Sequence, residues 1–210
     1  MGFLAFGAAF LPAWLGPDNH MRWTWLEVPR PLRTAYRISV LIGLLFQQWI
    51  APPARAQDPR VEYAVKAAFL LNFAKFAQWP PAVFADIQSP FEICVLGKDP
   101  FGPVLDEVVQ GESIDGHSVQ VRRVGTPPGA QSCQVLFVSP ETKDIKTVLG
   151  SIGPGVLVVG EGDRFVRDGG SISLVIENRR VRFDINQAAS EGRGVRLSSK
   201  LLSLARAVTK

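Results

Sequence analysis

Residues that commonly carry catalysis or bind metals are scarce in this sequence. After residue 57 there is one histidine, His117, and there are two cysteines, Cys94 and Cys133. This nearly excludes a metal cluster built on histidine and leaves a single candidate base for a nucleophilic serine. His117 follows Asp115-Gly116, a turn composition, so we expect it to be exposed.

The nucleotide-binding motifs are also missing. Gly97-Lys98 is followed by Asp99 instead of Ser or Thr, and no glycine stands five residues earlier, so it is not a phosphate-binding loop. Gly153-Pro154-Gly155 lacks the third glycine of a dinucleotide fingerprint. We therefore expect no catalytic residue, cofactor or metal ligand; a hydrolase using Ser139 or Ser171 with His117 is the weakest alternative.

Basic charge is concentrated at the N-terminus. The chain has 210 residues, 47% of them hydrophobic, and a formal net charge of +4. Residues 1–56 hold five arginines against Asp18 and Glu27, whereas 18 basic and 17 acidic residues follow. The remainder is close to neutral, which argues against a nucleic-acid-binding face.

Residues 30–57 have the layout of a secretory signal peptide. Three arginines precede an apolar run at residues 38–50, and Ala54 and Ala56 form an Ala-x-Ala cleavage site. The run is shorter than the roughly 20 residues of a membrane-spanning helix. We predict export to the periplasm with cleavage after Ala56; an uncleaved anchor is the alternative.

The first 32 residues fit that layout poorly, because residues 1–15 are apolar without a basic start. Translation from Met21 would explain them, and a two-segment membrane hairpin is the alternative. Either way, residues 1–56 form an N-terminal extension plus signal peptide, and residues 57–210 form one domain of ordinary size.

Strand and helix patterns alternate through residues 57–210. Helical spacing covers 61–79, with Val61, Val65, Ala68, Phe69, Phe73 and Phe76 on one face and a Glu62–Lys66 pair elsewhere. Further helices are expected at 99–109, where Asp99 is the N-cap, and at 140–149 and 198–208. Strands are expected at 91–96, 117–124, 133–139, 155–159, 171–176 and 180–185. This predicts an α/β domain with a mostly parallel sheet, helices on both faces and a C-terminal β-hairpin.

The two cysteines are candidates for a disulfide. Export would place Cys94 and Cys133 in an oxidising compartment, and their count is even. A bridge would close a loop of about 40 residues, worth roughly 4 kcal/mol in the chain-entropy model. Two buried thiols are the alternative.

Two charged clusters have simpler explanations than a site. Arg179, Arg180 and Arg182 fit a solvated strand face better than an anion site. Glu161, Asp163 and Asp168 surround a Gly-rich turn, and nothing in the sequence fixes their separation.

Three segments of residues 57–210 carry recognisable motifs. Two are residues 62–70 with Trp79-Pro80, and residues 93–102. The third is a C-terminal series that includes Gly160, Glu161, Phe165, Gly169, Gly170, Phe183, Asn186, Ser198, Ser199, Leu201 and Leu202. In this order and spacing, the segments resemble the YfiR family of periplasmic regulatory proteins. We expect most of these positions to be structural: a tight turn at Gly169-Gly170 and helix caps at Asn186 and Ser198.

The resemblance implies a dimeric α/β repressor that binds the periplasmic sensor region of an inner-membrane diguanylate cyclase and lowers cyclic di-GMP synthesis. An outer-membrane lipoprotein would sequester the repressor, and biofilm formation would follow. Well-studied members carry a second disulfide near the region corresponding to residues 166–175, where this chain has no cysteine. The alternative function is a small-ligand sensor subunit for a kinase or outer-membrane receptor, with its pocket near residues 97–102 and 160–165, at the carboxyl ends of parallel strands.

Overall fold

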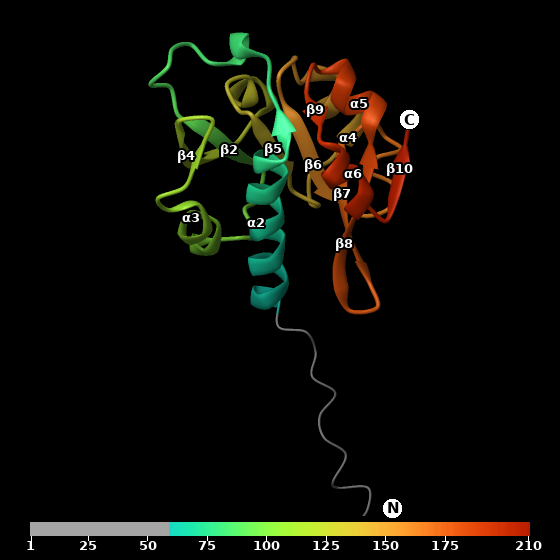
Figure 1. Cartoon of the computed structure of the whole chain (residues 1–210). Coiled ribbons are helices and arrows are strands. Elements are labelled where there is room, and N and C mark those ends of the chain that lie inside the picture. Colours follow the sequence, from blue (N-terminus) through green and yellow to red (C-terminus); the bar gives the residue numbers. More distant parts are fainter. Residues whose placement is uncertain (1–58) are drawn as a thin grey trace, which may run out of the picture. The chain divides into compact units, whose positions relative to one another are not determined.

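A computed structural model describes residues 59–210, drawn in colour in Figure 1. The helices are α2 (Pro59–Lys75), α3 (Pro103–Val109), α4 (Ile145–Ser151), α5 (Gln187–Gly192) and α6 (Ser199–Leu204), with 3-10 turns η2 (Pro81–Val83) and η3 (Pro127–Ala130). The strands are β1 (Ala77–Gln78), β2 (Phe91–Leu96), β3 (Ser113–Ile114), β4 (His117–Val124), β5 (Val135–Val138), β6 (Leu157–Glu161), β7 (Ile172–Glu177), β8 (Arg180–Asn186), β9 (Arg196–Leu197) and β10 (Ala207–Thr209). The predicted export signal and its cleavage site at Ala54 and Ala56 lie outside the described residues.

One mixed sheet organises the domain. Its eight strands follow the order β10-β8-β7-β6-β5-β2-β4-β3. Strands β4, β2, β5, β6 and β7 run parallel, β7 and β8 form an antiparallel hairpin, and β10 pairs with β8 in parallel. β1 and β9 form a separate antiparallel pair. The predicted fold class is confirmed.

Each face of the sheet packs against its own helices. On one face α2, α3 and α6 cover a core that contains Phe91, Ile93, Phe137 and Phe183. On the other face α4 and η3 cover Cys94, Leu96, Leu136 and Val158. Neighbouring residues of β2 alternate between the two cores, as expected of a central strand buried on both sides.

The predicted apolar face of the first helix meets the core only in its C-terminal half. Phe73 is buried and Phe69 and Phe76 pack against the core, whereas Val61 and Val65 are exposed. The other buried residues of the helix are Lys66, Ala67, Leu70, Leu71 and Ala74. The helix is apolar nearly all round, so periodicity alone did not decide which side meets the sheet. The helix also ends at Lys75, because Ala77 and Gln78 pair with β9.

Other boundaries also needed correction. Helix α3 begins at Pro103, and the Asp99 carboxylate instead accepts a hydrogen bond from the Phe101 backbone N–H at 2.7 Å within the preceding turn. Helix α4 begins five residues later than predicted, and β6 is shifted by two. The last helix ends at Leu204, and Val208 belongs to strand β10 at the sheet edge. The helices predicted at 99–109 and 140–149 thus included charged, proline-containing loops that precede α3 and α4.

Glycines hold one aromatic ring in the β6–β7 connection. A Cβ atom on Gly160 would lie 2.3 Å from the Phe165 ring, and one on Gly170 would lie 2.1 Å from it. Gly169 has a φ of +105°, which glycine adopts easily. The ring is therefore held between two glycine backbones, which explains why these positions occur together.

Candidate functional site

A cavity opens at the carboxyl ends of β2 and β5. The chain leaves β2 toward α3 on one face and leaves β5 toward α4 on the other, so the two loops separate. Open α/β sheets bind ligands at such a switch point. The cavity has a volume of about 590 Å³ and is lined by Pro59, Arg60, Tyr63, Lys98, Pro100, Phe101, Pro103, Val104, Ser139, Pro140 and Glu141.

The cavity wall is mostly apolar; of its charged residues, Arg60 belongs to α2, and Lys98 and Glu141 lie in loops. Tyr63 and Phe101 meet edge to face with centroids 5.4 Å apart. Lys98 forms a 2.8 Å ion pair with Glu141 across the two loops, with both side chains mostly exposed. The Glu141 carboxylate raises the pKa of Lys98 through this hydrogen bond. An apolar pocket with a few polar groups is the usual composition of a small-molecule site.

A buried lysine lies beside this cavity. Lys66 is 1% exposed, and its Nζ lies 2.6 Å from Glu62 and 2.5 Å from Glu161. The same ammonium is 4.4 Å from the centroid of the Tyr63 ring. Glu161 ends β6, so the lysine joins α2 to the carboxyl end of the sheet. The sequence showed the Glu62–Lys66 pair but not its burial or its second partner.

Tyr63 connects this ion cluster to the cavity. Burial first, and then the negative charge of Glu161, raise the pKa of Tyr63 to about 12. Glu62 and Glu141 act in the same direction. Within the described residues no hydrogen-bond partner reaches Glu161 Oε1. Tyr63 thus lies between the Lys66 ion cluster and the cavity, whose lining carries the charged residues Arg60, Lys98 and Glu141.

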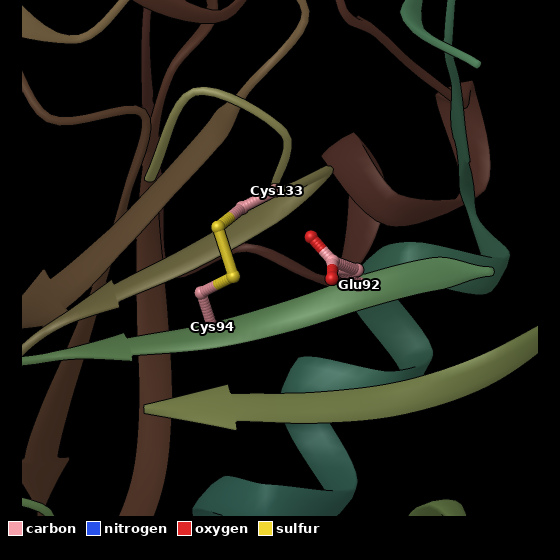
Figure 2. A group of neighbouring side chains, drawn as sticks. All are labelled: Glu92, Cys94 and Cys133. Carbon is pink, nitrogen blue, oxygen red and sulfur yellow. A yellow bond between two sulfur atoms is a disulfide. The ribbon is translucent and has the colours of Figure 1, made fainter. Parts of the chain in front are cut away.

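The two cysteines and one carboxylate form the group shown in Figure 2. Cys94 and Cys133 are joined by a disulfide, as predicted, with Cα atoms 5.9 Å apart. Glu92 lies close enough for all three residues to share a metal ion. However, disulfide sulfurs lack the thiolate charge that binds metals, and the Glu92 carboxylate pairs with Arg122 at 2.8 Å. These residues therefore do not fit a metal site.

The acidic residues near the Gly-rich turn do not form a pair. Glu161 binds Lys66, Asp163 accepts from Arg206 at 2.6 Å, and Asp168 lies 3.5 Å from Lys146. Their side chains are thus distributed among separate cations. This arrangement excludes the two-carboxylate interpretation of these three residues.

The expected exposure of His117 is wrong. Its ring stacks on Phe84 with centroids 3.9 Å apart, and Nδ1 lies 2.6 Å from the Ser89 carbonyl oxygen. Since that oxygen can only accept, Nδ1 carries a proton. The ring secures the loop before β2 and has no hydrogen bond to Ser139 or Ser171, the candidate nucleophiles.

The fingerprint residues occupy structural positions. Phe183 packs edge to face on Phe73 at 5.0 Å, and Asn186 and Ser198 accept hydrogen bonds from the first turns of α5 and α6. Ser199 begins α6, in which Leu201 is buried and Leu202 half-buried. Glu161, through its contact with Lys66, is the fingerprint residue placed next to the cavity.

Fold and site together define an α/β domain with a cavity at the switch point of its sheet. A family model described as YfiR/HmsC-like matches residues 63–206. The chain belongs to the YfiR/HmsC-like family. At family level this supports a periplasmic regulator of the diguanylate cyclase type. Within residues 59–210, no helix combines the length and apolar character needed to cross a membrane.

Solved structures are similar only in part. A conserved domain protein from Vibrio cholerae shares 12% identity at a TM-score of 0.42, covering 56% of this chain and 54% of its own. The ABC domain in complex with L-Trp from Streptococcus pneumonia shares 15% identity at a TM-score of 0.44, and the match covers 68% of this chain and 60% of that domain. The chain thus spans little more than half the length of these proteins. No curated protein matches it.

Proposed function

We propose that this protein is an exported, non-enzymatic repressor. It binds the periplasmic sensor region of an inner-membrane diguanylate cyclase and lowers cyclic di-GMP synthesis. The observation that carries the proposal is the family match across residues 63–206, nearly the whole described domain. Cleavage after Ala56, a homodimer and sequestration by an outer-membrane lipoprotein belong to the same proposal.

Co-expression with a membrane diguanylate cyclase tests this proposal. We expect cyclic di-GMP to fall when the full chain is exported and to stay unchanged when the arginines at 30, 33 and 37 are replaced to block export. A cyclase lacking its periplasmic region is the second control, and its output should not respond. If both cyclases respond equally, the protein does not act through that region.

The cavity favours a second function, a small-ligand sensor. Its volume of about 590 Å³ lies within the range of small-molecule sites, and it opens where α/β sheets bind ligands. A ligand that binds the native state raises the melting temperature. A thermal-shift screen with nucleotides and amino acids should find such a compound, and Phe101→Ala should abolish its shift. A shift that survives Phe101→Ala would place the ligand elsewhere.

A further inference from the structure

The exposed apolar side chains of the domain are unevenly distributed. Of the large hydrophobic residues that are clearly exposed, three lie near the N-terminal half of α2 and the β7–β8 turn: Val61 (62% exposed), Val65 (42%) and Ile176 (45%). In Figure 1 the β7–β8 hairpin extends past the rest of the sheet, at the end of the domain where α2 begins. This end of the domain therefore presents apolar side chains from two neighbouring elements.

Contacts in the core continue into this surface. Phe69 and Phe73 of α2 both pack on Phe183 of β8, with centroids 5.6 and 5.0 Å apart. Val65 lies one helical turn before Phe69, and Val181 lies two residues before Phe183 on the same strand face. Ile176 is the cross-strand partner of Val181. The core therefore continues outward between α2 and the hairpin without a covering element among the described residues.

The charges around this surface favour an acidic partner. Residues 59–65 and 176–182 contain Arg60, Arg179, Arg180 and Arg182 against Glu62 and Glu177. Glu62 pairs with the buried Lys66, and Glu177 lies 3.7 Å from Arg206. Four arginines against two carboxylates give these two segments an excess of positive formal charge. Arg180 and Arg182 are exposed and form no ion pair with another described residue.

The turn itself keeps an arginine where glycine is favoured. Asn178 and Arg179 connect the strands with φ values of +50° and +60°. The second position of such a turn usually holds glycine, because a left-handed conformation costs other residues roughly 1 kcal/mol. Arg179 thus places a cation at the hairpin tip despite this cost.

From these observations we infer that Val61, Val65, Val181 and Ile176, with the surrounding arginines, form the docking surface for an acidic, amphipathic helix in the periplasmic region of the membrane cyclase. This inference rests on the proposed function. The helix buries its apolar side against the exposed valines of α2 and the apolar side chains of the hairpin. Arginines at the rim and on the reverse of the thin hairpin attract its carboxylates, which raises the association rate.

Binding of chain 57–210 to the purified periplasmic region of the cyclase tests the surface. We expect Val65→Asp and Ile176→Asp each to weaken binding at least tenfold, because each buries a charge against an apolar partner. Ile87→Asp is the matched control, because Ile87 is 87% exposed in the loop before β2, at the amino ends of the parallel strands. The affinity of this variant for the cyclase region should change less than twofold. Val61→Asp is a further variant, chosen because a substitution in the first turn of α2 should disturb folding least. Thermal unfolding checks that all four variants are folded.

The outcomes separate the two proposals. If wild type does not bind the cyclase region, the proposed function fails. If wild type binds and the Val61, Val65 and Ile176 variants bind equally well, the function stands and this surface is wrong. The rim charges predict that Arg180→Glu with Arg182→Glu slows association and flattens its dependence on NaCl. A lipid partner is the other outcome. If wild type sediments with phosphatidylglycerol vesicles and Val65→Asp does not, while Val65→Asp still binds the cyclase region normally, this surface binds lipid and the protein partner is wrong.

Discussion

The two faces of the sheet differ in the bond that ties a strand to a neighbouring segment: a disulfide on one face and a buried ion pair on the other. On the α4 face a disulfide ties β2 to the segment before β5, and both sulfur-bearing residues are buried. On the α2 face a buried lysine ties the first helix to Glu161 at the end of β6. The covalent link depends on redox state alone, whereas the ionic link depends on every member of its cluster being charged. Only the ionic link adjoins the cavity.

The largest expected effect comes from removing the covalent link. Replacing both Cys94 and Cys133 with alanine should lower the free energy of unfolding by about 4 kcal/mol, because the bridge spans a sequence separation of 39 residues. Urea denaturation of chain 57–210 measures this, and reduction of wild type should give a similar loss. A loss that changes with salt concentration would contradict a purely covalent role.

Removing the ionic link should have the next largest effect. Lys66→Ala leaves Glu62 and Glu161 facing each other without their cation, so we expect a loss of about 3 kcal/mol. Lys75→Ala on the same helix is the matched control, because its 2.7 Å pair with Glu112 is partly exposed and should contribute less than about 1 kcal/mol. Equal losses in the two variants would show that burial of Lys66 has no energetic consequence.

The pKa of Tyr63 reports on the ionic link. The folded pKa of about 12 lies above the ordinary tyrosine pKa of 10.0, so the native state keeps a proton that the unfolded chain releases. Stability from this group is complete below pH 10 and is lost as the pH rises toward 12. Tyr63 is the sole tyrosine of chain 57–210, so absorbance at the phenolate band follows it directly.

Glu161→Gln should move this titration toward lower pH, because burial then remains as the principal cause. Tyr63→Phe should remove the corresponding alkaline loss of stability. A titration midpoint near 10 in wild type would show that neither burial nor Glu161 raises the pKa of the phenol.

The smallest effect is expected at the cavity mouth. Lys98 pairs with Glu141 at 2.8 Å, yet both side chains are mostly exposed to solvent. Lys98→Ala should therefore leave the melting temperature unchanged within error, since solvent screens exposed pairs. A clear destabilisation would indicate that the two loops depend on this pair to form the cavity.

The sequence predicted the features that depend on neighbouring residues. β2 was predicted with its observed bounds, and the Asn178-Arg179 turn follows from alternating residues on either side. The bridge between Cys94 and Cys133 followed from an even count and the export signal. These features follow from strand periodicity, turn composition and redox compartment.

The candidate site depended on contacts that local patterns do not contain. Lys66 is part of an i,i+4 pair that is typical of an exposed helix face, and its second partner, Glu161, is 95 residues away. The same ambiguity placed Val61 and Val65 on the predicted apolar face, although both are exposed. A helix that is apolar nearly all round meets the sheet along the side that packs best, which sequence periodicity does not specify.

The most direct test of the central claim is titration calorimetry of chain 57–210 with the periplasmic region of a membrane diguanylate cyclase from the same organism. We expect saturable binding, with a negative heat-capacity change from apolar burial that is smaller in Ile176→Asp than in Ile87→Asp. If no such cyclase region encoded by the organism binds, the protein is not a repressor of this kind.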